Sequence, residues 1–241
     1  MKLRKRLSKD QAIFLGLKPK KKTNYGNAQY CLTQDQYSRL NEYKKSKRTE
    51  KPKHAKILVF DIETAPNKAW VWGKWKQNIN DDAYTSDWFI LTWSAKWLFD
   101  DKVYSAKLTS KEAKNQDDYR ICKSLFRMID EADILIGHNI KKFDCKKINT
   151  RFLLHELGSP SSYLMIDTLQ HARKQFSFNS NKLDYIAQQL GVGKKVEHSG
   201  FKMWLECLDG NEEALNQMQK YNDGDIMINE EVYLKLRPFI K

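Results

Sequence analysis

Long apolar runs are missing from this chain of 241 residues. None approaches the ~18–20 consecutive apolar residues that a membrane-spanning helix needs. The first residues, MKLRKRLSKDQ, carry charge without the apolar stretch of a secretory signal. We therefore expect no membrane partner and a cytoplasmic location, associated with the nucleoid or, for a viral protein, in the host cytoplasm.

Cysteine is also scarce. The four cysteines form no CxxC pair, and the five histidines do not cluster with them. This spacing argues against a disulfide framework and against a zinc site. We expect reduced cysteines that serve mainly in packing: Cys31, Cys122, Cys145 and Cys207.

The excess positive charge lies in the N-terminal quarter. Residues 1–56 contain 17 Lys and Arg against 4 Asp and Glu, whereas residues 57–241 contain 26 of each. A concentrated basic segment attracts polyanions, although such a run can also be only a solvated tail. We expect a small basic module of helix-turn-helix-like form at 1–43, a linker at 44–56 and a larger domain at 57–241.

From Ile57 onward, apolar runs of strand length precede longer helical patterns. The run ILVF is typical of a central buried strand. Further strands are expected at 70–73, 89–98, 102–108 and 134–137, and helices at 115–131, 143–157, 168–176, 183–190 and 211–236. Strands first and helices later, around one sheet, predict an α/β domain.

Two acids end the first of these strands. Asp61 and Glu63, in ILVFDIET, share one face because side chains alternate along a strand. Two neighbouring carboxylates repel each other, and a bound divalent cation resolves the repulsion. The alternative is a strand-end turn with solvated acids.

Two further acids stand on apolar helix stripes. Asp144 aligns with Ile148 and Phe152, and Asp225 lies one turn after Tyr221 on a core-facing stripe. A carboxylate there is costly unless it is paired or bound to metal. The alternatives are an acid favoured by the helix dipole at Asp144 and a satisfied buried acid beside a core tyrosine at Asp225.

Four converging carboxylates would suit phosphodiester hydrolysis. Two divalent ions roughly 3.5–4 Å apart can activate a water, neutralise a phosphate and stabilise the leaving oxygen. Hard oxygen ligands favour Mg²⁺ or Mn²⁺. The sequence thus predicts a nuclease that uses two such ions, held by Asp61, Glu63, Asp144 and Asp225.

Three motifs resemble a known family. FDIET, GHNIKKFD and YNDGD, in this order, are similar to the motifs of the DEDD 3′–5′ exonucleases, which have a ribonuclease H-like fold and include the proofreading domains of DNA polymerases. The spacing of Tyr221 and Asp225 is that of the tyrosine branch (DEDDy). Lys220 stands where the histidine branch has its histidine. The resemblance covers roughly residues 57–238 and implies a mixed central sheet flanked by helices.

The resemblance also implies roles for these residues. Asp61, Glu63 and Asp225 would hold the metal that activates the water. Asp61 and Asp144, the latter mostly through water, would hold the metal on the leaving-group side. Tyr221 would orient the attacking water, and nucleoside 5′-monophosphates would leave from a 3′ end.

Substrate contacts are expected nearby. The backbone of Thr64 could touch the terminal nucleotide, although a turn role is the alternative. Asn139 could bind substrate or serve the turn. Phosphate contacts could come from the lysines that flank Asp144, namely Lys141, Lys142, Lys146 and Lys147; the alternative is a solvated helix face. His138 is expected to be structural.

Three tryptophans alternate with lysines. Aromatic side chains among lysines can stack on unpaired bases. We expect core packing for Trp70 and Trp72 and leave base stacking open for Trp75. Asp167 is expected to cap a helix.

The leading hypothesis is a 3′–5′ exonuclease on single-stranded DNA in replication, repair or recombination, with a polymerase or another replication or repair protein as a partner. The alternatives are an exoribonuclease that uses the same site on RNA and a catalytically silent nucleic-acid-binding module. Tyr221 and the motif order make a structure-specific endonuclease the weaker interpretation.

Overall fold

A computed structural model describes residues 3–18, 28–49, 55–194 and 199–240. The chain separates into two compact units, Met1–Ala55 and Lys56–Lys241, each of which is described by itself. Within the described ranges, no helix is both long and apolar enough to span a membrane.

The first unit has the element order β1 (Leu3–Leu7), α1 (Lys9–Phe14), β2 (Ala28–Leu32) and α2 (Gln34–Thr49). Strands β1 and β2 pair antiparallel. Ser8 and Gln11 form a capping box that starts α1. Leu7, Leu32 and Leu40 are buried in a small core.

This β-α-β-α arrangement differs from the expected helix-turn-helix-like module. Strand β1 was hidden in the sequence because charged residues fill most of LRKRL. Helix α2 also runs into the expected linker, as far as Thr49. Since the first proline after it is Pro52, no helix breaker stands between Lys44 and Thr49. The rest of the expected linker lies partly outside the described residues.

The second unit contains a five-stranded mixed sheet in the order β7-β6-β3-β8-β9. Strand β3 pairs antiparallel with β6 and parallel with β8. Neighbouring β7 is antiparallel to β6, and β9 is parallel to β8. The strands are β3 (Ile57–Thr64), β6 (Ile90–Trp97), β7 (Val103–Lys107), β8 (Ile134–Gly137) and β9 (Leu164–Asp167).

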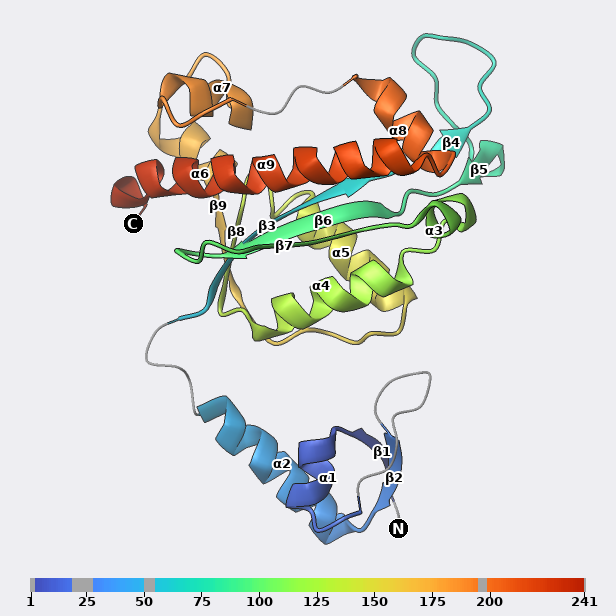
Figure 1. Ribbon diagram of the computed structural model, residues 1–241, viewed down its shortest axis with the longest axis vertical. Coiled ribbons are helices and arrows are strands. Elements are labelled where there is room, and N and C mark those ends of the chain that lie inside the picture. Colours follow the sequence, from blue (N-terminus) through green and yellow to red (C-terminus); the bar gives the residue numbers. More distant parts are fainter. Residues whose placement is uncertain (1–2, 19–27, 50–54, 195–198, 241) are drawn as a thin grey trace. The chain divides into compact units, whose positions relative to one another are not determined.

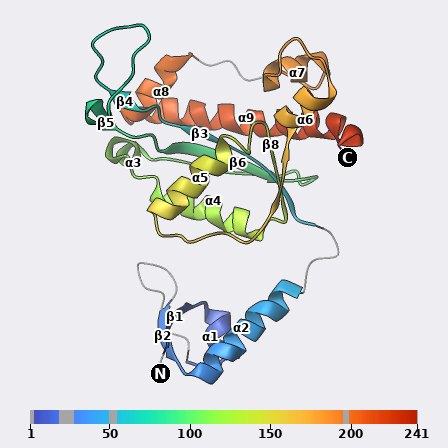
Figure 2. The same cartoon turned by 180° about the vertical axis from the view of Figure 1, so that it is seen from behind.

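Helices cover both faces of this sheet. Helix α9 runs across one face, over β3, β6 and β7, while α4 and α5 lie on the other face (Figures 1 and 2). The helices are α3 (Ser110–Asn115), α4 (Tyr119–Glu131), α5 (Asp144–Leu154), α6 (Thr168–Gln175), α7 (Leu183–Gln189), α8 (Phe201–Leu208) and α9 (Glu212–Leu236), followed by the 3₁₀ turn η2 (Arg237–Phe239). The α/β prediction with a mixed central sheet flanked by helices is confirmed.

Strand β3 shows how the sequence builds these layers. Leu58, Phe60 and Ile62 are fully or almost fully buried in the large core that also contains residues of α4 and α5. Val59 points to the other face, where it packs with Ile226 of α9. Because side chains alternate, Asp61 and Glu63 share the face of Val59 and so face α9.

Several elements differ from the sequence predictions. The strand expected at 70–73 is absent; short strands β4 (Lys68–Ala69) and β5 (Tyr84–Ser86), with the 3₁₀ turn η1 (Asp81–Ala83) between them, occupy this region instead. Strand β9 and helices α3 and α8 were missed because each is short and offers little periodicity. In the described residues all four cysteines are free; Cys31 is exposed and the other three are buried.

Candidate active site

Three carboxylates converge where β3 meets α9. Oxygens of Asp61, Glu63 and Asp225 all lie within 4.8 Å of one another. Asp225 is 3% exposed, while the two strand acids are half-buried. The cluster therefore has a buried side on the helix and an open side on the strand.

Polar contacts with β6 and β3 fix the position of α9 on the sheet, and with it the position of Asp225. The Thr92 hydroxyl of β6 lies 2.8 Å from Gln219 Oε1, and the Ser94 hydroxyl donates to Asp223 at 2.7 Å. The Asn222 amide donates to Asp61 Oδ2 at 2.6 Å. These contacts orient α9, since a helix rotated on the sheet would lose all of them together.

A β-bulge ends the regular pairing at the site. The register between β3 and β6 shifts between Glu63 and Thr64. Bulges bend a strand and redirect its side chains, and they are common beside active sites. Here the shift follows directly after the second strand acid and turns the chain toward a neighbouring pocket.

Asp144 lies beside this cluster, at the start of α5. It is 3% exposed, and its Oδ1 accepts a hydrogen bond from the Ile62 amide at 3.2 Å. That amide needs a partner because β8, which pairs with the start of β3, ends at Gly137. Burial, together with the charges of Glu63 and Asp167, raises the pKa of Asp144 to about 7. This carboxyl is thus held beside the cluster but lies outside the trio that meets within 4.8 Å.

Tyr221 lies one helical turn before Asp225 and is 8% exposed. Its ring packs edge-on against Trp204 of α8, with ring centroids 6.4 Å apart. The tyrosine therefore connects the carboxylates to α8 and to the pocket that α8 lines.

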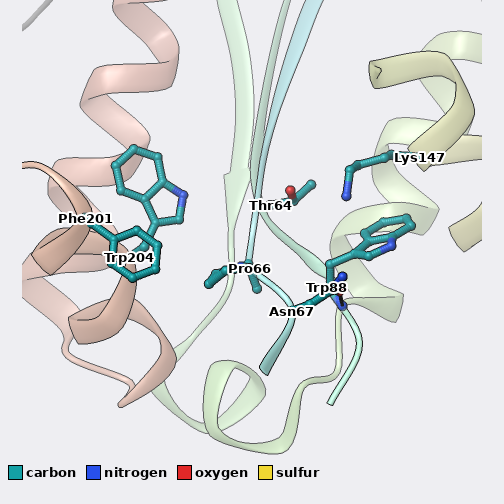
Figure 3. A pocket seen from close by; sticks show the side chains of 8 residues that line it. Thr64, Pro66, Asn67, Trp88, Lys147, Phe201 and Trp204 are labelled. Carbon is teal, nitrogen blue, oxygen red and sulfur yellow. Dashed lines mark hydrogen bonds between the residues drawn. The ribbon is translucent and has the colours of Figure 1, made fainter. Parts of the chain in front are cut away.

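That pocket has a volume of about 340 Å³. Figure 3 shows Trp204 and Phe201 on one side, Trp88 and Lys147 on the opposite side, and Thr64 and Pro66 between them. Lys147 Nζ lies 3.7 Å from the centre of the Trp88 ring, a cation–π contact. Burial lowers the pKa of Lys147. A flat, apolar ligand with a negative group matches these walls.

The predicted substrate residues lie in two places. Thr64 lines the pocket. Asn139 and Lys141 belong to the turn before α5, where their backbone amides donate to Asp167 at 3.0 and 3.3 Å. Asn139 has φ +71°, which asparagine tolerates better than most residues. Lys142, in the same turn, is exposed.

Two structural expectations near the site are confirmed. Asp167 caps α6 by accepting from the amides of Leu169 and Gln170. Both ring nitrogens of His138 form hydrogen bonds. Nδ1 lies 3.0 Å from the Thr168 hydroxyl, and Nε2 lies 2.9 Å from the Asn181 carbonyl oxygen. Both residues hold the turn that precedes Asp144.

The expectation that Trp70 and Trp72 pack in the core is wrong. Trp70 is 77% exposed and Trp72 is fully exposed. The strand that was expected to bury them does not form, so no sheet neighbours cover them.

Sequence reasoning also missed residues that shape the site. Trp88, Phe201 and Trp204 line the pocket, and Asn222 holds Asp61. A weak signal existed for Asn222, which lies one residue after Tyr221 within the third motif. Trp204 carried none, because its contact with Tyr221 depends on how α8 packs against α9.

The donor set fits a divalent cation. Three carboxylate oxygens from a strand and a helix approach one another more closely than like charges prefer, and hard oxygen ligands suit Mg²⁺ or Mn²⁺. Burial is the main cause of the raised pKa of Asp144, with a further contribution from the negative charge of Glu63 and Asp167. A cation would neutralise it.

A second candidate group, Asp118, Cys122 and His155, fits a metal poorly. The guanidinium of Arg151 already bonds to Asp118, and burial raises the pKa of the Cys122 thiol well above its usual range. A protonated thiol beside a fixed cation is a poor ligand.

Comparison with known proteins agrees with this architecture. A solved family B DNA polymerase from the hyperthermophilic archaeon Pyrobaculum calidifontis is similar in fold, with a TM-score of 0.57 and 16% sequence identity. The match covers 78% of this chain but 25% of the polymerase, so the chain spans about a quarter of that protein's length. No curated protein matches the sequence.

The family model of the RNase_H superfamily matches residues 90–237. These residues make up more than half of the chain and include Asp144, Tyr221 and Asp225, while Asp61 and Glu63 precede them. With the mixed sheet and its covering helices, the match confirms the predicted ribonuclease H-like fold. The chain belongs to the RNase_H superfamily.

Proposed function

We propose that this protein is a metal-dependent 3′–5′ exonuclease of the tyrosine DEDD branch that degrades single-stranded DNA and releases nucleoside 5′-monophosphates. The observation that carries the proposal is the approach of Asp61, Glu63 and Asp225 within 4.8 Å, with Tyr221 one turn away on α9. Superfamily membership supports nuclease chemistry.

The four carboxylates would coordinate two metal ions. Asp61, Glu63 and Asp225 would hold the first ion, and Asp61 with Asp144 would hold the second. When bound, two Mg²⁺ or Mn²⁺ ions supply an activated water and neutralise charge on the phosphate. The Asn222 amide keeps Asp61, the shared ligand, in one orientation through its 2.6 Å hydrogen bond.

Tyr221 would position the attacking water through its hydroxyl. Its ring packs against Trp204, and this contact would restrict the positions that the hydroxyl can take. The site must place a water in line with the scissile bond, and effective catalysis depends on such fixed geometry.

The pocket beside Thr64 would receive the base of the terminal nucleotide. Its aromatic walls suit stacking, and Lys147 would attract a phosphate. Asn139, Lys141 and Lys142 would contact the strand from the turn before Asp144. The similarity of fold to a DNA polymerase favours DNA as the substrate. It also favours a polymerase or another replication or repair protein as a partner.

The test is a cleavage assay on 5′-labelled single-stranded DNA, duplex DNA and RNA, with Mg²⁺, Mn²⁺ or EDTA. We expect single-stranded DNA to shorten stepwise from its 3′ end with either metal and to stay intact in EDTA. A discrete internal cut would refute the exonuclease proposal. Shortening of RNA alone would favour the exoribonuclease, and binding without cleavage would favour the silent module.

Variants assign the chemistry to the site. Asp225→Asn should lower the rate by more than the roughly 10–100-fold that outer partners of metal ligands contribute. Glu231→Gln is the matched control, since Glu231 is an exposed acid on the same helix. Equal activity of the two variants would show that chemistry occurs elsewhere.

A further inference from the structure

A protruding segment carries the most exposed tryptophans of the described chain. We name residues 68–86 the tryptophan arm; it runs from β4 through η1 to β5. Trp70 is 77% exposed, Trp72 is fully exposed and Trp75 is 78% exposed. Figures 1 and 2 both show this segment extending away from the sheet, beyond β4 and β5.

The stem of the arm is well tied. Lys68 pairs with Ser86 and Ala69 with Tyr84. The Trp70 amide donates to the Ala83 carbonyl at 2.9 Å. These bonds fix the base of the arm and leave its tip to solvent.

Packing within the domain does not explain the three tryptophans of the arm, because their side chains are exposed to solvent. Residues 71–80 are all exposed, and Val71 and Ile79 add further apolar surface. Single exposed apolar residues are ordinary, but a contiguous group of large ones marks a binding surface. Tryptophan combines a broad flat face with a polar N–H, which suits contact with a partly polar partner.

Positive charge lies among these aromatics. The segment KAWVWGKWK (68–76) holds three lysines and no acid, while Asp81 and Asp82 lie on the returning side of the arm. Lys74 Nζ lies 5.4 Å from the centre of the Trp75 ring. Flat rings interleaved with cations match the alternating bases and phosphates of a single strand.

The arm is continuous with the pocket of the proposed active site. Asn67, directly before the arm, accepts at 3.0 Å from the amide of Trp88, two residues beyond its other end. Both residues line the pocket, together with Lys147. A strand whose last base enters the pocket would therefore have its preceding nucleotides at the base of the arm.

We infer that the tryptophan arm binds unpaired nucleotides of a single-stranded nucleic acid by stacking and holds the strand upstream of the nucleotide in the pocket. The inference deepens the proposed function, because it rests on the 3′ end lying at the carboxylates. Binding by stacking tolerates any base sequence, since every base offers a flat face.

Binding is tested apart from cleavage by titrating a fluorescein-labelled 20-nucleotide oligo-dT with the full chain in EDTA and following the fluorescence anisotropy of the label. Replacing Trp70, Trp72 and Trp75 together by Ala should raise the Kd about tenfold or more, and replacement by Phe should raise it less because a ring remains. Lys74→Ala with Lys76→Ala should reduce the dependence of binding on salt. Leu153→Ala, at an equally exposed apolar residue of α5, is the control.

A substrate of one nucleotide distinguishes an effect of the arm on strand binding from an effect on hydrolysis. The p-nitrophenyl ester of thymidine 5′-monophosphate supplies one nucleotide and no upstream strand, so its hydrolysis with Mg²⁺ should fall far less in the triple Ala variant than the affinity for oligo-dT. Equal losses would show a structural role and overturn the inference. An unchanged Kd would overturn it as well, as would arm-dependent binding of phosphatidylglycerol vesicles in place of oligo-dT.

The two proposals fail separately. A protein that binds oligo-dT through the arm but hydrolyses neither substrate refutes the exonuclease alone. One that hydrolyses both substrates regardless of the arm refutes the stacking inference alone.

Discussion

Asn222 donates a hydrogen bond of 2.6 Å to Asp61 across 161 positions of sequence, and its side chain is completely buried. This single contact joins α9 to the carboxylate that both ions would share. It also leaves only part of that carboxylate available for other partners. The amide therefore helps to fix the orientation of the Asp61 carboxylate.

Replacing Asn222 by Ala should free Asp61 to rotate and weaken metal binding. We expect a loss of roughly 10–100-fold in activity at limiting Mg²⁺, partly restored at high Mg²⁺, because outer partners of metal ligands contribute about this much. Titration of the nuclease rate with Mg²⁺ measures it. Asn216→Ala, at an exposed asparagine of the same helix, is the control; an Asn222→Ala titration curve like that of the control would contradict the prediction.

The buried carboxyl of Asp144 should make the metal-free protein less stable as pH rises. Burial, with help from Glu63 and Asp167, raises its pKa to about 7 from 3.8. A carboxyl that holds its proton more tightly in the folded state adds stability that is complete below pH 4 and lost as pH rises to about 7. The loss is at most on the order of 4 kcal/mol.

Asp144→Asn imitates the protonated form and should remove this loss. Its Oδ1 can still accept from the Ile62 amide. We expect the variant in EDTA to be more stable than the wild type at pH 8 and similar at pH 4, measured by urea unfolding. Mg²⁺ should stabilise the wild type at pH 8 and the variant much less. Parallel curves for the two proteins in EDTA would refute the assignment.

The strongest local patterns predicted the fold well. ILVF has a neighbour on each side in the central sheet, and the long helix from residue 211 agrees with α9 to within one residue. Asp61, Glu63 and Asp225 could be singled out because an acid at a buried strand end or on an apolar stripe is visible without knowledge of the partner.

What failed depended on contacts between distant residues. Trp70 and Trp72 look like core residues, and only the missing sheet neighbours leave them exposed. Helix α8 has eight residues, too few for a convincing period, yet it supplies Trp204. Nothing near Asn222 in the sequence reveals that its partner lies in β3.

Lys96 of β6 and Glu230 of α9 form a buried ion pair that sequence alone could not show. Their side chains are 6% and 5% exposed, and Glu230 also accepts from the Phe99 amide at 3.0 Å. Lys96→Met would leave the acid buried without its cation. We expect a loss of about 3–5 kcal/mol in the free energy of unfolding.

Urea unfolding of single and double variants tests this pair. Lys96→Met with Glu230→Gln should recover most of the loss, because no unpaired charge remains. Lys202→Met is the control, since Lys202 pairs with Glu206 at 3.5 Å on the surface and is 74% exposed; it should cost less than about 1 kcal/mol. If the double variant is no better than Lys96→Met, the loss comes from packing.

Asp118 is a completely buried acid that ties the start of β6 to α5. Its carboxylate accepts from the Ile90 amide at 2.8 Å and from Arg151 Nε at 2.7 Å, and lies 2.5 Å from His155 Nε2. Burial alone would raise its pKa, but the hydrogen bonds from Arg151, the Ile90 amide and His155 outweigh it and hold the pKa below its usual range.

Asp118→Asn should therefore destabilise the fold in a way that depends on pH. A carboxyl with a lowered pKa adds stability that is present above about pH 4 and is lost as pH falls through its pKa in the folded state. We expect a loss of about 3 kcal/mol at pH 7, where Arg151 loses its anion, and a smaller loss near pH 3. Urea unfolding at both pH values measures the difference. The neighbouring exposed Asp117, replaced by Asn, is the control, and a loss for Asp118→Asn that is equal at both pH values would show that shape, not charge, holds this junction.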